Sequence, residues 1–144
     1  TDCGCIVMHP GDPDDLNGAG GDILERVRAF FEKKTTEAEQ HGVNKNRLCF
    51  DPGIGFGKTN EENFALIANP EEIRVPGTAL LMAASRKRVI GAVCGNPPFE
   101  DRMAGTVAAH TASVLFGADM VRAHDTFEAV QAARVADAIK QFRK

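Results

Sequence analysis

The sequence contains no tryptophan and no tyrosine. This argues against sugar-binding and single-stranded nucleic-acid-binding proteins, whose sites usually offer aromatic stacking platforms. A basic excess is also missing. The net charge is −3 at pH 7, which excludes a protein that coats nucleic acid through bulk charge. No run of about 18 apolar residues occurs, so no membrane partner or span is expected. Residues 1–4 lack the regions of a signal peptide. We therefore expect one domain in the cytoplasm.

Cysteine is also scarce, with four residues in 144. Cys49 and Cys94 lie in apolar runs, which is typical of reduced thiols in the core of a cytoplasmic protein. Cys3 and Cys5 could bind a metal ion, but no second Cys/His pair follows at ligand spacing. The composition excludes a disulfide scaffold and leaves the role of Cys3 and Cys5 open.

What the chain does contain is a strand–helix alternation repeated four times. Apolar runs with turn signals predict strands over 5–8, 47–50, 78–83 and 119–122. Asp22 is a predicted N-cap for a helix that stops at Gly42, and Asn60 for one that ends near 69–70. A short helix is expected to open at Ser85. Two longer helices are expected over 101–116 and from 125 or 126 to the end of the chain.

Strands that are nearly all apolar, separated by helices, predict an α/β fold with parallel strands and both faces of the sheet covered. Two architectures fit: an open doubly wound sheet, or part of a (β/α)₈ barrel. A whole barrel needs about 250 residues, so this chain could form only half of one.

Ionisable and hydrogen-bonding side chains gather where each predicted strand ends. They are His9, Asp51, the Ser85–Lys87 run and the Arg122–Asp125 run. In both parallel architectures these ends share one rim, where ligands bind. Solvated loop charges explain one such strand end easily and four less well.

Residues 51–59, Asp-Pro-Gly-Ile-Gly-Phe-Gly-Lys-Thr, imitate a phosphate-binding loop but fail its spacing, because the first glycine position holds Pro52. They also fail the dinucleotide fingerprint. We interpret them as a loop that needs a permissive backbone at three glycines. An ionised Asp51 could hold a flat ring with adjacent N–H donors, the alternative being a carboxylate that only stabilises the turn.

The Ser85-Arg86-Lys87-Arg88 run predicts an anion site at a helix start, the alternative being a solvated basic turn. Arg122 and His124 alternate onto one face of an extended strand end, where they could grip a phosphate or diphosphate. His41 and His110 are expected to be structural, and His9 is left open between function and loop hydrogen bonding.

These motifs resemble dihydropteroate synthase. The resemblance is carried by residues 51–59, by Ser85-Arg86-Lys87 with Ile90-Gly91, by Arg102 in Glu-Asp-Arg-Met-Ala-Gly, and by Val121-Arg122-Ala123-His124-Asp125. It implies a (β/α)₈ TIM barrel of folate biosynthesis that condenses 4-aminobenzoate with 6-hydroxymethyl-7,8-dihydropterin diphosphate. The products are 7,8-dihydropteroate and diphosphate, and sulfonamides compete for the aminobenzoate site.

The resemblance also implies roles for single residues. Asp51, Lys87, Met8 and Phe56 would bind the pterin. Ser85, Arg88 and Phe56 would bind aminobenzoate. Arg122 and His124 would bind diphosphate, and these two together with Lys87 would be the catalytic residues. In one departure from the family, Ala83 stands where a glycine is usual.

By the same resemblance, residues 1–144 are the carboxyl-terminal half of a pterin-binding barrel domain, with four βα units that correspond to its strands five to eight. The amino-terminal half, which helps to hold Mg²⁺ and diphosphate, has no match here, so no metal ligand is expected in this half. The chain is expected to be a fragment, inactive alone, that forms a homodimer or pairs with the missing half. The alternatives are a pterin-binding methyltransferase domain and a non-catalytic half-barrel.

Overall fold

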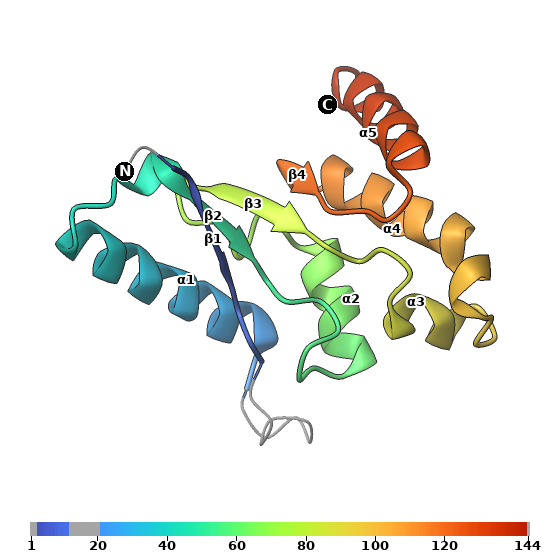
Figure 1. Cartoon of the computed structure of the whole chain (residues 1–144), viewed down its shortest axis with the longest axis horizontal. Helices are drawn as coiled ribbons and strands as arrows, with labels where there is room; N and C mark the ends of the chain where they lie inside the picture. Colours follow the sequence, from blue (N-terminus) through green and yellow to red (C-terminus); the bar gives the residue numbers. More distant parts are fainter. Residues whose placement is uncertain (1–2, 12–20, 144) are drawn as a thin grey trace.

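Four parallel strands form a sheet whose spatial order follows the chain. The computed structural model describes residues 3–11 and 21–143. Within them β1 (Cys5–Met8), β2 (Leu48–Asp51), β3 (Ala79–Met82) and β4 (Met120–Val121) lie in the order β1-β2-β3-β4 (Figure 1). Each pairs in parallel with its neighbour. A doubly wound sheet would reverse its strand order at a switch point, so the sequential order decides for the barrel-like architecture.

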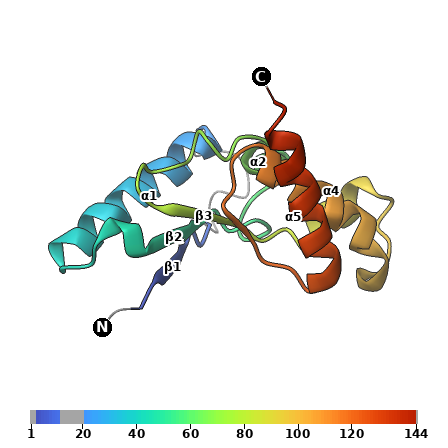
Figure 2. The same cartoon turned by 90° about the horizontal axis from the view of Figure 1, so that it is seen from above.

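A helix follows each strand or the loop after it. The helices are α1 (Ile23–Gln40), α2 (Asn60–Ala68), α3 (Arg88–Val93), α4 (Met103–Leu115) and α5 (Thr126–Lys140), with short 3₁₀ helices η2 (Lys45–Arg47) and η3 (Phe99–Arg102). Figure 2 shows α1 and α2 on the same side of the sheet. None of the described helices is long and apolar enough to cross a membrane.

The main core lies between the sheet and these helices. Alternate strand residues, among them Phe50, Leu80 and Met82, point to it and meet Phe31 of α1 and Leu66 of α2. The rings of Phe31 and Phe50 stack with 4.5 Å between their centroids. Burial of these side chains fixes which residues of each strand face the helices, since side chains alternate along a strand.

The opposite face of the sheet, which we call the inner face, is only partly covered. Cys49, Leu81 and Ala83 form a small buried cluster there, but Ile6 is 65% exposed and Met120 42%. The strand register places Ile6 beside Cys49 and Met120 beside Leu81, so both belong to this face. The expectation that both faces would be covered is therefore wrong for the described residues.

Several predicted boundaries shift by one or more residues. Thr59, not Asn60, caps α2, and it forms a capping box with Glu62. The Ser85–Lys87 run precedes α3 instead of opening it, because Arg86 has a φ of 54° and is not helical. The start predicted at Asp101 falls within η3. The polar loop predicted over 11–15 lies outside the described residues except for Gly11.

Cys5, Cys49 and Cys94 are free thiols. Cys49 is buried, as predicted, but Cys94 is exposed, so its assignment to the core is wrong. Cys94 follows the short helix α3 at its carboxyl end. Its apolar neighbours in the sequence do not bury it because the adjacent Val93 is also exposed, at 65%.

The predicted packing role of His110 is confirmed, because this α4 residue is 1% exposed. Neither of its ring nitrogens has a hydrogen-bond partner within the described chain. Burial lowers the pKa of His110 below its ordinary value. As pH falls below about 6.5, the unfolded state therefore takes up a proton that the folded state resists, and stability is lost.

We expect His110→Leu to raise the free energy of unfolding by about 1 kcal/mol or more, because unpartnered buried polar atoms cost about 1–3 kcal/mol. Between pH 6.5 and pH 5 the free energy of unfolding should also fall less in the variant than in the unaltered protein. Urea unfolding at several pH values measures both effects. His41→Gln, which replaces an exposed imidazole, is the control and should not reproduce the gain. A less stable His110→Leu variant would contradict the expectation.

Candidate active site

The carboxyl ends of the four strands surround one cavity of about 300 Å³. It is lined by Met8, Asp51, Phe56, Ala83, Ser85, Lys87, Arg122, Ala123 and His124. Seven of the eight predicted site residues are therefore brought together, from the ends of all four strands and the loops that follow them. The eighth, Arg88, does not line this cavity. The methyl group of Ala83 forms part of the wall.

The loop after β2 follows Asp51, carries Phe56 and is shaped by the three predicted glycines. Gly53, Gly55 and Gly57 have φ values of 71°, 83° and 54°, which glycine adopts without strain. At Gly53 a Cβ atom would lie 2.1 Å from the carbonyl oxygen of His9. The loop therefore packs backbone against backbone on the segment after β1, and the need for three permissive positions is confirmed.

Asn63 fixes the same loop from α2. Its side-chain oxygen accepts the Gly55 N–H at 2.6 Å, and its amide nitrogen donates to the carbonyl oxygen of Thr59 at 2.7 Å. Asn63 is 2% exposed. The sequence analysis missed it, although a polar residue at a core-facing helix position was a usable signal.

Asp51 is buried at the end of β2 among cations. Oδ1 accepts the Gly53 N–H at 2.7 Å. Burial raises the pKa of Asp51, while the Gly53 N–H and the charges of Lys87, Lys58 and Arg122 oppose that rise. A desolvated carboxylate with remaining lone pairs suits a ligand that presents N–H donors.

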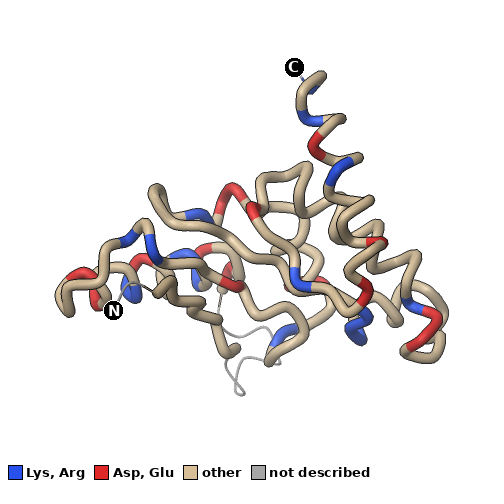
Figure 3. The backbone as a smooth tube through the Cα atoms, turned by 45° about the horizontal axis from the view of Figure 1, so that its top comes forward, with Lys and Arg blue, Asp and Glu red and all other residues tan. Residues whose placement is uncertain are grey.

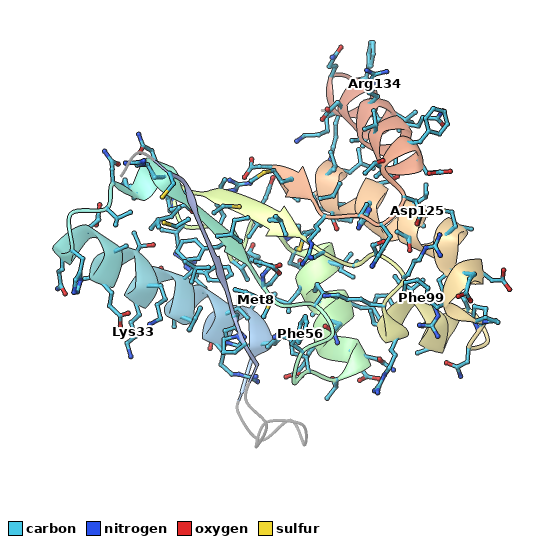
Figure 4. All side chains as sticks on the ribbon, in the orientation of Figure 1. Met8, Lys33, Phe56, Phe99, Asp125 and Arg134 are labelled. Carbon is cyan, nitrogen blue, oxygen red and sulfur yellow. The ribbon has the colours of Figure 1, made fainter. Side chains whose placement is uncertain are left out.

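Lys87 lies beside the acid. Its ammonium group donates to the carbonyl oxygen of Ile54 and lies 4.6 Å from the centroid of the Phe56 ring. Burial lowers the pKa of Lys87, and Asp51 acts in the opposite direction. Figure 4 shows Phe56 near Met8, the last residue of β1, and both line the cavity. Asp51, Lys87 and Phe56 thus combine an acid, a base and an aromatic ring around one space.

The turn after β3 is held by polar contacts to four residues later in the chain. Arg86 donates to both carboxylate oxygens of Asp125, at 2.7 and 2.5 Å. The Arg86 N–H donates to Thr106 Oγ1 at 2.9 Å, and its carbonyl oxygen accepts from Arg102 Nη1 at 3.1 Å. Ser85 Oγ lies 2.8 Å from His124 Nδ1. The positive charge of Arg86 is therefore neutralised by Asp125. Of the three cations in the predicted anion site, Arg86, Lys87 and Arg88, the first is not available to an anion.

Arg122 and His124 come from the segment that extends β4. The Arg122 N–H donates to the carbonyl oxygen of Met82 at 3.0 Å, so strand pairing continues past Val121. The two side chains line the same cavity, together with Ala123 between them, and both are exposed. Charges of both signs are intermingled along the described chain (Figure 3), and the cavity brings the cations Lys87 and Arg122 together with one acid, Asp51.

Arg88 lies in a second, adjacent hollow of about 570 Å³. This hollow is lined by Pro10, Gly11, Gly55, Phe56, Gly57, Lys58, Lys87 and Arg88. Phe56 and Lys87 form the partition, because they line both spaces. His9, which was left open, is buried, with Nδ1 accepting the Gly11 N–H at 3.2 Å and the ring against Phe30.

Lys58 is the second site residue that the sequence analysis missed. It was treated only as the end of the glycine loop, yet it is 8% exposed, and Nζ donates to the carbonyl oxygens of Gly53 at 3.2 Å and Phe56 at 3.0 Å. Burial lowers its pKa to about 8, a change that Glu62 and Asp51 oppose and Arg26 and Lys87 reinforce. A lysine directly before a helix cap gives no sign of this burial.

The described residues contain no group of three or more His, Cys, Asp or Glu side chains that could hold a metal ion. Of the two acids at this end of the sheet, Asp51 faces cations and Asp125 is engaged by Arg86. A divalent cation therefore does not fit the residues present here without ligands from elsewhere.

Lys58 makes a testable contribution to stability. Between pH 8 and about 10.4 the unfolded chain binds a proton that the folded chain has released, so the free energy of unfolding rises with pH, by up to about 3 kcal/mol. We expect Lys58→Met to remove this rise. Denaturant unfolding from pH 7 to 10.5 measures it, and Lys33→Met on the exposed face of α1 is the matched control (Figure 4). An equal pH dependence in the two variants would refute the assignment.

Comparison with known proteins gives the site a context. Residues 1–124 match the family model described as pterin binding enzyme. Dihydropteroate synthases of Synechocystis and Escherichia coli are 36% and 34% identical, each over 93% of this chain but only 47% and 48% of their own lengths. The chain thus spans about half the length of these curated relatives.

Solved structures agree. A dihydropteroate synthase of Xanthomonas albilineans with 4-aminobenzoic acid superposes with a TM-score of 0.86 at 36% identity, over 95% of this chain and 49% of that one. The enzyme of Coxiella burnetii in complex with pteroic acid gives 0.90 at 29% identity, over 97% and 52%. Because the family match covers most of the sequence and the fold agrees, this chain belongs to the pterin binding enzyme family.

Proposed function

We propose that this chain is the carboxyl-terminal half of a dihydropteroate synthase barrel and supplies half of its active site. The observation that carries the proposal is the single cavity in which Asp51, Lys87, Arg122 and His124 meet. A buried acid for N–H donors, beside cations for an anion, matches a substrate that is a donor-rich ring at one end and a diphosphate at the other.

The pterin would occupy the space between Asp51, Lys87, Met8 and Phe56. Asp51 would accept hydrogen bonds from the 2-amino group and ring N–H. Lys87 would donate to the oxo and ring-nitrogen side. Burial of Asp51 supports this role, because a hydrogen bond to a charged group gains strength away from water. The half-exposed Met8 and Phe56 offer apolar surface to the faces of a flat ring.

Aminobenzoate would lie on the other side of Phe56, in the second hollow, with Arg88 as the candidate for its carboxylate. The shared wall of Phe56 and Lys87 supports this division, because two substrates that react must occupy adjoining spaces. Ser85 was predicted beside Arg88 in this role, but its hydroxyl is engaged by His124.

In the reaction the aromatic amine attacks the methylene carbon of the pterin, a C–N bond forms, the C–O bond to diphosphate breaks, and the amine loses a proton. Negative charge grows on the departing diphosphate, so the charged Arg122 and the hydrogen-bond donor His124, placed in advance, lower the barrier. No covalent enzyme intermediate is needed. Mg²⁺, which the family resemblance implies, would need ligands from the other half of the barrel and from the substrate.

The uncovered inner face supports the proposal that this half of the barrel has a partner. Ile6, Met8 and Met120 leave apolar surface open on the side of the sheet that the rest of a barrel would cover. We propose that the amino-terminal half of the barrel covers it, as part of the same protein or as a partner chain, and that the 144-residue chain alone has no turnover. The free thiols of Cys5, Cys49 and Cys94 are in keeping with the cytoplasm as its location.

Asp51→Asn should weaken pterin binding in the completed barrel by at least about 2 kcal/mol, because the amide offers one acceptor and a misplaced donor in place of a charged double acceptor. Calorimetry with a dihydropterin ligand measures the loss. Asp137→Asn, on the exposed side of α5, is the control for the same chemical change and should leave the affinity unaltered. Unchanged affinity of Asp51→Asn would remove the pterin assignment.

Arg122→Lys should lower kcat more than it raises KM, because an ammonium cannot reproduce the bidentate fork on phosphate oxygens whose charge grows in the transition state. Arg134→Lys on α5, far from the cavity (Figure 4), should leave kcat unchanged. Free diphosphate should compete with the pterin substrate. A pterin-binding methyltransferase, whose substrate carries no diphosphate, would show no such competition.

A further inference from the structure

The cavity contains a polar contact that the proposed function leaves unexplained. Ser85, at the end of β3, and His124, after β4, are joined twice. Ser85 Oγ accepts the backbone N–H of His124 at 3.1 Å and lies 2.8 Å from Nδ1 of its ring. Ser85 is 4% exposed. One buried hydroxyl therefore fixes both the backbone and the ring of a residue that lines the cavity.

The hydrogen-bond inventory of the hydroxyl decides which ring nitrogen carries hydrogen. A serine hydroxyl has one hydrogen to donate and two lone pairs. One lone pair takes the His124 N–H. Within the described chain, Nδ1 is the acceptor that the structure offers to the hydroxyl hydrogen. If Nδ1 carried a hydrogen instead, the buried hydroxyl hydrogen would lose this acceptor, which costs about 1–3 kcal/mol.

A second set of contacts confines the ring. The rings of Phe99, from η3, and His124 meet in a T-shaped arrangement with 5.3 Å between centroids and an interplanar angle of 84°. Arg86 lies 5.1 Å from the centroid of the same Phe99 ring, and Asp125 binds Arg86. Figure 4 shows Phe99 and Asp125 beside the loop that carries His124. The adjacent carboxylate of Asp125 is thus occupied by Arg86.

We propose that Ser85 is a positioning residue that holds His124 in the neutral tautomer with hydrogen on Nε2. Neutral His124 then presents an N–H donor to an anionic oxygen in the cavity that it lines, beside the charged donor Arg122. This inference rests on the proposed function for the identity of the anion, but the tautomer itself does not depend on it. It also assigns Ser85 to the diphosphate side of the site in place of the aminobenzoate side.

The tautomer can be measured directly. Two-dimensional ¹⁵N–¹H correlation of the histidine rings at pH 8.5, with His124 assigned through His124→Gln, should show hydrogen on Nε2 and none on Nδ1. In Ser85→Ala the pattern should change to a mixture of tautomers. Ser113→Ala, which removes another fully buried serine hydroxyl from within α4, is the matched control and should leave the His124 signals in place. Hydrogen on Nδ1 in the unaltered protein, or an unchanged pattern in Ser85→Ala, would overturn the proposal.

A binding measurement on the completed barrel separates the two roles of Ser85. If Ser85 positions His124, Ser85→Ala should weaken inhibition by free diphosphate about tenfold, with the KM for 4-aminobenzoate nearly unchanged, and Ser85→Thr should restore part of the loss. A raised KM for aminobenzoate with normal diphosphate inhibition would overturn the positioning role. If diphosphate binds to neither protein while the tautomer is as stated, the proposed function fails and the tautomer assignment stands.

Discussion

The parallel pairing of four short strands in chain order is the constraint on which the site depends. Because the strands run the same way, their carboxyl ends meet at one rim. Because side chains alternate, each strand end gives one side chain to the inner face and the next to the helices. Burial of Phe50 and Met82 against the helices thereby commits Asp51 and Ala83 to the cavity. Packing of the core therefore fixes which side chains of each strand face the helices, and this in turn determines which side chains line the cavity.

The charged side chains at the rim fall into two groups. Some hold the loops in place, and others line the cavity. Arg86 and Asp125 neutralise each other and tie the loop after β3 to the start of α5. Lys58 is used inside the glycine loop. Asp51, Lys87 and Arg122 remain turned to the cavity, where they influence one another through space. Polar side chains lie all along the rim, but only some of them face the cavity.

Strand ends and glycine spacing are local patterns, so the sequence was sufficient to predict the strands, the α/β class, the three permissive glycines and five of the cavity residues. Met8 and Phe56 were expected in the site only from the family resemblance. The sequence could not predict which charged residues pair with one another. Arg86 meets Asp125, and Ser85 meets His124, each across 39 residues, and these contacts exist only once β3 and β4 are side by side. The burial of Lys58 and Asn63 depends in the same way on how the loop folds back over α2. Cys94 was misjudged because apolar neighbours in sequence do not ensure a covering element in space.

The close approach of Gly53 to the carbonyl of His9 also bears on how such a site can diversify. The segments that follow β1 and β2 touch there through main-chain atoms, so neither can accept a side chain at the contact without moving the other. Side chains can be substituted instead at positions that project from this fixed backbone, such as Phe56 and Arg88. Substitutions at these two positions can therefore change the lining of the second hollow while the backbone around the buried acid keeps its geometry.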